Sequence, residues 1–489
     1  MRLNLYRSKI AKCLSVLILY NVVIVLYEQS KFRNVYGTIL VRTKFRKVVS
    51  FLITELREGR LKPGDKLPTH RELAYQHGLS LGTATRVFAE LDSLGLTTGE
   101  VGRGTFVRMN ANTKSTDFFL TSRESDFVDF SRNHLVLPEQ KDILMNTMRE
   151  VVSNQDSDVL VYRNNSGSDY DRNCAWKWLN SNRISAIETY ENVTICSGGQ
   201  HGLLLCFLAI CNPGDTVVVE RYTYPGIRTL ADTLGIELVL VDGDTQGICP
   251  DSFEEICKTI RPKALFCMPN LQNPTSITMP LSRRKELLSL MEKYDVLAIE
   301  DDAYGFQLPD PPPSLSELNP ERVFYLNTLS KSWAPGLRVG YLVSPKGWAK
   351  VVDHAQAASV YMSTPLIMSM ATQLILSKQY DQIVRAKRKE IAKRQAIVDR
   401  VFGNWPIQSD PRSMHVVIPL AQKLRADEVL ARLLEKRIVA APLSQFSAAH
   451  DAGKGPEGIR LCIGAPQIRA DMKSGLEKTR EIIGDWDSK

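Results

Sequence analysis

The stretch at residues 323–343, VFYLNTLSKSWAPGLRVGYLV, decides the fold of most of this chain. Its two apolar ends, residues 323–327 and 338–343, are rich in the residue types that favour strands. The polar loop between them holds two serines and a lysine at position 331, and an arginine at position 338 directly follows it. Ligands of open α/β sheets bind in the loops that follow the carboxyl ends of the strands. The stretch therefore predicts two strands of a buried sheet with Lys331 at a binding site.

Similar apolar runs recur on the N-terminal side of this stretch, with helical segments such as 203–210 and 281–293 between most of them. Alternating strands and helices predict an α/β domain with a mainly parallel sheet. We expect this domain to span residues 131–489, with a small α+β subdomain at its C-terminal end. The five further predicted strands lie at residues 193–195, 216–219, 237–241, 264–268 and 296–299.

The loops after these strands contain the groups that a single cofactor would need. Ser197-Gly198-Gly199-Gln200 opens a helix, where backbone N–H groups can bind a phosphate. A lysine amine can condense with an aldehyde, and a carboxylate can keep a pyridine nitrogen protonated. Taken singly, Lys331 is more often a surface lysine and Asp301 a helix cap. Their succession at strand ends, together with Tyr224, Asn273 and Tyr304, predicts pyridoxal 5′-phosphate as the cofactor.

With these motifs, residues 131–489 resemble the fold-type I aminotransferases. The resemblance implies that Lys331 is the catalytic lysine that forms an imine with the cofactor, and that Asp301 pairs with the pyridine nitrogen. It also implies that Arg460, in the sequence GIRL, binds a substrate carboxylate through two hydrogen bonds. The other implied cofactor contacts are Gly199, Gln200, Thr328, Ser330 and Arg338 at the phosphate, Asn273 and Tyr304 at the ring oxygen, Tyr224 on the ring face, and Tyr162 in the neighbouring subunit's site. Tyr162 thereby implies a homodimer, although residues 163–166 depart from the usual pattern.

Residues 37–108 have the pattern of a winged helix-turn-helix domain. Apolar residues recur with helical spacing from Phe45 to Leu56, and Thr69 and Glu72 form a capping box before a second helix. Ser80 can cap a third helix, and residues 96–107 alternate like a two-stranded hairpin. The third helix of such a domain lies in the major groove of DNA. We expect Ser80 and Thr83 at its start to face base edges.

The head also resembles a known family, through GRLKPGDKLPTHRELA at residues 59–74 and GRGTFV at residues 102–107. Both strings resemble the GntR family of bacterial repressors, which implies double-stranded operator DNA as a partner. In this resemblance Arg71, Thr85, Arg86 and the wing residue Arg103 are DNA contacts. A GntR-type head joined to an aminotransferase-like body resembles the MocR subfamily of transcription regulators.

The distribution of charge supports a DNA-binding head. The chain has a net charge of +8 over 489 residues, and residues 1–36 and 37–110 each carry +5. The rest of the chain is therefore close to neutral, an asymmetry typical of nucleic-acid-binding heads. Nine scattered cysteines without a CxxC pair predict free thiols in a reducing cytoplasm and no metal site. We expect residues 109–130, which are polar, to form a linker.

The segment at residues 14–27 is almost wholly apolar and follows four basic residues. It is short for a membrane-spanning helix and is interrupted by Asn21. We favour an N-terminal extension without a defined role over residues 1–36, with a membrane anchor as the alternative.

The sequence thus predicts a pyridoxal phosphate-dependent transcription regulator that senses the cofactor, an amino acid or an amine. The alternative is a working aminotransferase that carries a DNA-binding head.

Overall fold

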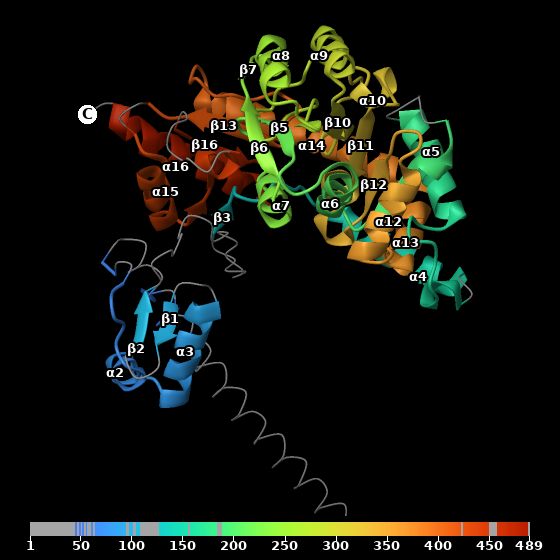
Figure 1. Cartoon of the computed structure of the whole chain (residues 1–489). Coiled ribbons are helices and arrows are strands. Elements are labelled where there is room, and N and C mark those ends of the chain that lie inside the picture. Colours follow the sequence, from blue (N-terminus) through green and yellow to red (C-terminus); the bar gives the residue numbers. More distant parts are fainter. Residues whose placement is uncertain are drawn as a thin grey trace, which may run out of the picture. The chain divides into compact units, whose positions relative to one another are not determined.

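The computed structural model divides the chain into two compact units, residues 1–123 and 124–489, which are described separately. Figure 1 shows their elements. The structure describes residues 45, 48, 49, 51, 52, 55, 60, 61, 64–93, 97–100, 104–107, 127–154, 157–182, 188–421, 424–448 and 457–487. The apolar segment 14–27, most of the linker and Arg103 lie outside these ranges. No helix in the described ranges is both long and apolar enough to cross a membrane.

The N-terminal unit contains the predicted second and third helices and the hairpin. They are α2 (His70–Gln76), α3 (Leu81–Ser93), β1 (Thr97–Glu100) and β2 (Gly104–Val107), with β1 and β2 antiparallel. The capping box at Thr69 and Glu72 is formed, and the Ser80 hydroxyl accepts from the backbone N–H of Thr83. Leu73, Ala84, Val87 and Leu91 are fully buried and hold α2 and α3 together. Phe45, Val48 and Leu52 of the predicted first helix are helical.

The C-terminal unit is built on a seven-stranded sheet with the order β4-β12-β11-β10-β9-β5-β6. Every predicted strand is present, and only β12 runs against its neighbours. The predicted start of the last strand at Arg338 was wrong, because Arg338 has a left-handed φ of 53° that turns the chain two residues before β12. The strands are β4 (Val193–Cys196), β5 (Thr216–Glu220), β6 (Glu237–Val241), β9 (Ala264–Cys267), β10 (Leu297–Asp301), β11 (Val323–Thr328) and β12 (Gly340–Val343).

Helices cover this sheet and bury its strands almost completely. Strands β4, β9, β11 and β12 have no exposed residue, as expected for a sheet covered on both faces. One apolar core includes α6 and α7, and another includes α8 and α9. The helices of this domain are α4 (Glu139–Asn154), α5 (Asp169–Asn182), α6 (Gly199–Ile210), α7 (Gly226–Leu234), α8 (Pro250–Thr259), α9 (Leu281–Tyr294), α10 (Leu315–Leu318), α11 (Leu329–Ser332), α12 (Ala349–Ser359) and α13 (Pro365–Leu376).

The predicted C-terminal α+β subdomain is also present. Its three-stranded antiparallel sheet has the order β13-β16-β15, with β13 (His415–Pro419), β15 (Ala441–Pro442) and β16 (Gly458–Cys462). Strand β14 (Ile438–Val439) pairs with β3 (Val128–Asp129), which ties the N-terminal end of this unit to the subdomain. The helices are α14 (Gln379–Phe402), α15 (Ala426–Glu435) and α16 (Arg469–Asp487). Strand β16 carries Arg460 toward the large domain, as the contacts below show.

Candidate active site

Lys331 lies in the one-turn helix α11, directly after the buried strand β11. The Thr328 side chain caps α11 by accepting from the backbone N–H of Ser330. The Lys331 ammonium donates to the backbone carbonyl of Asn133 at 2.8 Å. Burial lowers the pKa of Lys331 to about 8, and the charges of Arg460 and Arg338 act in the same direction. An amine with this pKa is partly neutral, and hence nucleophilic, at neutral pH.

Asp301 ends β10, the strand next to β11, so it reaches the same edge of the sheet as Lys331. Its Oδ1 accepts from the backbone N–H of Ala303 at 3.0 Å. Burial raises the pKa of Asp301 to about 7, and the adjacent charge of Asp302 raises it further. Asp302 itself is tied down by Asn270 and by the Tyr325 hydroxyl at 2.7 and 2.6 Å. A cation beside Asp301 would compensate the buried carboxylate.

Tyr304 is held by two residues that the sequence analysis did not identify, Asn133 and His415. The Asn133 amide nitrogen is 2.9 Å from both the Tyr304 hydroxyl oxygen and Nδ1 of His415. Nε2 of His415 contacts the Gln272 carbonyl, which can only accept, so Nδ1 is the unprotonated nitrogen. The Tyr304 oxygen therefore accepts from Asn133 and keeps its own hydrogen for a further acceptor.

No pattern in the sequence distinguishes Asn133 or His415. Asn133 stands in the irregular stretch SRNH, and His415 stands inside the apolar run of β13. A histidine on an apolar face is more often a core residue than a site residue. Burial lowers the pKa of His415 to about 3, so it stays neutral. Only the packing of β13 against the large domain brings it to Tyr304, with ring centroids 5.5 Å apart.

Arg460 and Asn273 meet although they are 187 positions apart in the sequence. Nη1 of Arg460 donates to Oδ1 of Asn273 at 3.0 Å, and Nη2 donates to the Ser131 carbonyl. The Asn273 amide N–H groups are thereby oriented away from Arg460. The Arg460 guanidinium also lies 4.3 Å from the centre of the Phe446 ring. Its Nε is buried and has no hydrogen-bond partner among the described residues.

The residues predicted to bind the phosphate form one cluster. The Thr328 and Ser330 hydroxyls are 3.0 Å apart, and Nη1 of Arg338 is 3.4 Å from the Ser330 hydroxyl. Gly198, with a φ of +86°, precedes α6, and a side chain at this position would lie 2.8 Å from the Arg338 guanidinium. Gly199 packs beside Thr328. The N-terminal end of α6 and Arg338 therefore share one small space that suits an anion.

Gln200 and Tyr224 complete the other side of this cluster. The Gln200 amide donates to the Gly226 carbonyl at 3.1 Å, while its oxygen is buried without a partner among the described residues. A side chain at position 226 would collide with both Gln200 and Tyr224, so all three lie in contact. The Tyr224 ring is half-buried against the core that contains Tyr304.

Tyr162 does not join these residues within one subunit. It follows a short 3-10 turn, η2 (Ser157–Leu160), and its side chain is 81% exposed. It packs edge-on against Tyr361, with ring centroids 5.5 Å apart. Leu160 and Val161 are also exposed, at 85% and 51%. Tyr162 thus belongs to an exposed apolar patch made of Leu160, Val161, Tyr162 and Tyr361.

The predicted DNA contacts of the head differ in their exposure and in the contacts they make within the protein. Arg71 and Ser80 are exposed, whereas Thr83 is 7% exposed and its hydroxyl is 2.8 Å from that of Ser80. The Thr85 hydroxyl donates to the Leu81 carbonyl and therefore accepts from His70. The Arg86 guanidinium lies 5.2 Å from the centre of the Phe45 ring. Thr85 and Arg86 are exposed as well, so among the described members of this set only Arg71 is both exposed and without such a contact.

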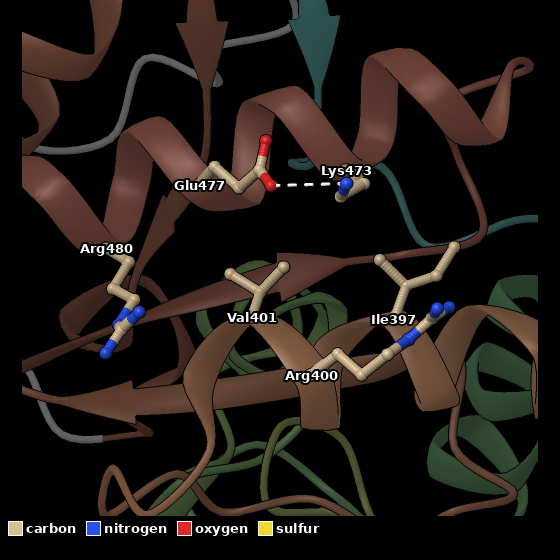
Figure 2. Close-up of a pocket in the computed structure, with 6 residues that line it drawn as sticks. All are labelled: Ile397, Arg400, Val401, Lys473, Glu477 and Arg480. Carbon is tan, nitrogen blue, oxygen red and sulfur yellow. Dashed lines mark ion pairs between the residues drawn. The ribbon is translucent and has the colours of Figure 1, made fainter.

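A surface depression between α14 and α16 is separate from this site (Figure 2). Basic side chains and one ion pair, Lys473 with Glu477, surround its apolar floor. None of its lining residues belongs to the cluster around Lys331. That cluster combines a buried amine, a buried carboxylate and a helix start that suits an anion, so it is the better candidate for the active site. The lining residues are Ile397, Arg400, Val401, Lys473, Glu477 and Arg480.

The cluster around Lys331 fits pyridoxal 5′-phosphate. Two buried polar atoms, Oε1 of Gln200 and Nε of Arg460, have no partner within the described ranges and can be satisfied by a ligand. A buried carboxylate, an amine of lowered pKa and an anion-binding helix start stand at the same edge of the sheet. Asn273 and Tyr304 both keep a hydrogen to donate. This set matches the pyridine nitrogen, the aldehyde, the phosphate and the ring oxygen.

Comparison with known proteins agrees with this fold. Residues 125–478 match the family of class I and II aminotransferases, and residues 45–107 match the gntR family of bacterial regulatory proteins. The uncharacterized HTH-type transcriptional regulator YdeF of Bacillus subtilis is 26% identical over 452 residues, covering 90% of this chain and 94% of YdeF. A mouse mitochondrial kynurenine/alpha-aminoadipate aminotransferase is 36% identical over 199 residues, covering 38% of this chain and 47% of that protein.

A solved structure shows the same fold. The kynurenine aminotransferase of Pyrococcus horikoshii, crystallised with PMP, superposes with a TM-score of 0.68 at 24% identity, covering 74% of this chain and 92% of that chain. The family match confirms the predicted cofactor, pyridoxal 5′-phosphate. The chain therefore belongs to the class I and II aminotransferase family and joins its aminotransferase-like domain to a GntR-type DNA-binding head.

Proposed function

We propose that this protein is a cytoplasmic transcription regulator of the MocR type, which binds operator DNA through its head and an amino acid or amine through its cofactor site. The observation that carries the proposal is the complete cluster around Lys331 in a chain that also has a GntR-type head. YdeF, a regulator by name, matches over nearly the whole length of both proteins, which supports the regulatory function. The eight cysteines of the described ranges are free thiols, which supports the cytoplasm.

Each residue of the site has a distinct part in this proposal. When bound, pyridoxal phosphate supplies an aldehyde that reacts with amines and a ring that withdraws electrons. Lys331 provides the amine that holds the aldehyde in the resting state. Asp301 holds a proton at the pyridine nitrogen, because the carboxylate favours a cation beside it. Tyr304 and Asn273 would donate to the ring oxygen, and Tyr224 would pack against the ring.

The phosphate and the effector are bound at opposite ends of the site. Thr328, Ser330, Arg338 and the backbone of Gly199 hold the phosphate, together with Gln200. Arg460 binds the carboxylate of the effector through its guanidinium, whose Nε has no partner among the described residues, which favours an α-amino acid over a simple amine. A Lys331 amine released from the aldehyde would regain the hydrogen bond that its ammonium donates to the Asn133 carbonyl. This change of contacts gives two states that an effector can bias.

The proposal includes a homodimer. Tyr162 is far too exposed for a tyrosine with a role inside its own subunit, and it stands in the apolar patch of Leu160, Val161, Tyr162 and Tyr361. A neighbouring subunit that covered this patch would bring Tyr162 to its own cofactor site. A dimer would also offer two heads to two operator half-sites.

The experiment that tests the function is a visible spectrum of the purified protein with a panel of amino acids, run with and without 2-oxoglutarate. A band that shifts with one amino acid, without formation of a keto acid, supports a sensor and identifies the effector class. In parallel, operator binding is measured with the same amino acids. A protein that takes up no pyridoxal phosphate contradicts the proposal.

The second candidate is a working aminotransferase with a DNA-binding head. It is favoured by one observation: Lys331, Asp301 and Arg460 are all present at a single site, so the groups for amino transfer are complete. Turnover distinguishes the two functions. Repeated conversion between the pyridoxal and pyridoxamine forms, with accumulation of a keto acid product, would make the protein an enzyme first.

A further inference from the structure

A third extended segment pairs with the wing hairpin of the head, and it carries Lys66. Residues 64–67, which precede α2, run antiparallel to β2, with Lys66 opposite Phe106. Backbone hydrogen bonds of 2.9 to 3.0 Å join this segment to β2. Leu67 is buried, whereas its neighbour Lys66 is exposed. Since successive side chains of an extended segment point to opposite faces, Lys66 stands on the face turned away from the core.

The Lys66 side chain lies along the start of β2. A side chain at Gly104 would come within 2.8 Å of Cε of Lys66 and 3.5 Å of its Nζ. Gly104 has a φ of +118°, a conformation that residues with a side chain rarely adopt. The ammonium is 5.9 Å from the centre of the Phe106 ring. Lys66 thus lies beside the residue that directly follows Arg103, a predicted DNA contact outside the described ranges.

The charge of Lys66 also acts on the first turn of α2. The pKa of Glu72 lies below its usual range, chiefly because the backbone N–H of Thr69 donates to the carboxylate at 2.7 Å, and the charge of Lys66 lowers it further. Arg71, an exposed predicted DNA contact, stands next to Glu72 in this turn. Lys66 is therefore close to both parts of the head in which phosphate contacts are expected, the wing and the start of α2.

The Lys66 ammonium is available to an anion. It forms no hydrogen bond and no ion pair with another residue of the described ranges. Arg60, by contrast, is already paired with Glu55 at 2.6 Å. Duplex DNA carries about one negative charge per 1.7 Å of its axis, and a lysine that neutralises a phosphate releases a bound counterion. An exposed, unpaired cation beside two predicted DNA contacts suits such a phosphate.

We propose that Lys66 binds a phosphate of the DNA backbone, so that the DNA-binding surface of the head extends from the first turn of α2 across residues 64–67 to the wing. The inference rests on the proposed function, because it requires that the head binds DNA. A phosphate contact carries no information on the bases. Lys66 therefore contributes to the affinity for operator and unrelated DNA alike.

The test is the salt dependence of DNA binding by the full-length protein. The probe is a fluorescent DNA duplex of arbitrary sequence, about three helical turns long, titrated at several salt concentrations between roughly 50 and 200 mM. Lys66→Met keeps the apolar length of the side chain beside Gly104 and removes its charge. We expect the slope of log affinity against log salt to decrease by about one for each bound head, and the affinity at about 100 mM salt to fall by about five- to tenfold.

Two control variants separate the charge from other effects. Lys66→Arg keeps the charge and should keep the slope of the wild type. Lys350→Met, at an exposed lysine of α12, changes the net charge of the protein by the same amount and should leave the slope unchanged. Thermal unfolding checks the fold of each variant, and Lys66→Gln replaces Lys66→Met if that variant does not fold.

The outcomes are distinct. A slope equal to that of the wild type in the folded, uncharged Lys66 variant overturns the phosphate contact and leaves DNA binding by the head intact. A decreased slope that Lys66→Arg shares also overturns it, because the loss then comes from packing and not from charge. A wild-type protein that does not bind the duplex at any of these salt concentrations overturns the proposed function, and this inference with it.

Discussion

At the scale of single residues, the site is characterised by charges that burial makes unfavourable. Lys331 has a pKa lowered to about 8, and Asp301 has one raised to about 7, each chiefly through desolvation. A positively charged pyridine ring beside Asp301 would reverse this cost, because an opposite charge stabilises the carboxylate. The site is thus less stable by itself than with the cofactor that its residues fit.

The first prediction concerns Lys331. Lys331→Ala should abolish the visible band of bound cofactor and the response of operator binding to effector, because it removes the amine that the proposal assigns to the aldehyde. Operator affinity without effector should stay within about twofold of the wild type, since the head is intact. Absorbance and operator titrations measure both effects, with the exposed Lys350→Ala as a control. An unchanged effector response in Lys331→Ala would rule out a sensor that works through this lysine.

The second prediction concerns Asp301 and pH. Its pKa in the folded protein, about 7, lies above the ordinary 3.8, so its contribution to stability is complete below pH 4 and is lost as the pH rises to 7. Asp301→Asn replaces the titrating carboxyl with a neutral amide, so the variant does not lose stability in this way as the pH rises. We expect the cofactor-free variant to gain on the order of a few kcal/mol in unfolding free energy over the wild type between pH 4 and pH 7. Urea unfolding at several pH values measures this difference.

The same variant should bind pyridoxal phosphate more weakly, because a neutral amide cannot hold a proton at the pyridine nitrogen. If the unfolding free energies of the variant and the wild type change in parallel between pH 4 and pH 7, Asp301 does not have a raised pKa in the folded protein.

At the scale of elements, the start of α3 is stabilised internally before it can reach DNA. The Ser80 and Thr83 hydroxyls pair with each other, and the Thr85 hydroxyl is engaged by Leu81 and His70. These contacts fix the third helix at its N-terminal end. Arg71 in α2 is exposed and forms no hydrogen bond or ion pair with another described residue, so among the predicted contacts it is the charge most available to a phosphate.

The third prediction follows from this arrangement. Arg71→Ala should weaken binding to operator and to unrelated DNA alike, and should reduce the slope of log affinity against log salt by about one. Fluorescence anisotropy at several salt concentrations measures the slope. Arg60→Ala is the matched control, because the Arg60 guanidinium is already paired with Glu55 at 2.6 Å. An unchanged slope in Arg71→Ala would exclude a phosphate contact by this residue.

At the scale of the whole molecule, a sensor must couple its two units energetically. If an amino acid changes operator affinity by some factor, operator DNA must change the affinity for that amino acid by the same factor, typically about 5- to 150-fold. The fourth prediction is that these two factors agree. Calorimetric titration of the amino acid with and without operator, and operator titration with and without amino acid, give both numbers. An amino acid that binds without changing operator affinity would favour the enzyme over the regulator.

The fifth prediction concerns the dimer. Tyr162→Asp places a charge in the patch of Leu160, Val161, Tyr162 and Tyr361, so we expect a weaker dimer and a slower response to effector. Sedimentation velocity over a range of concentrations measures the dissociation. Tyr75→Asp, at an equally exposed tyrosine in the head, is the control. A dimer of unchanged affinity would place the subunit interface elsewhere.

The sequence alone determined the architecture. Apolar runs such as residues 264–268 and 323–327 predicted strands, because a strand buried on both faces needs a continuous apolar segment. The capping box at Thr69 and Glu72 predicted the start of α2, since capping acts between residues three positions apart. The same local logic identified Lys331, Asp301 and Tyr304, which stand in the loops that follow predicted strands.

Only the tertiary structure decided the contacts between distant segments. It brought Asn133 and His415 to Tyr304, joined Arg460 to Asn273 and placed Lys66 beside Gly104. None of these pairs follows from sequence spacing, because each depends on how separate elements pack against one another. A buried polar group takes whatever partner the packing supplies. Local patterns therefore determined which elements form and which loops carry the chemistry, while long-range packing determined the partners that tune it.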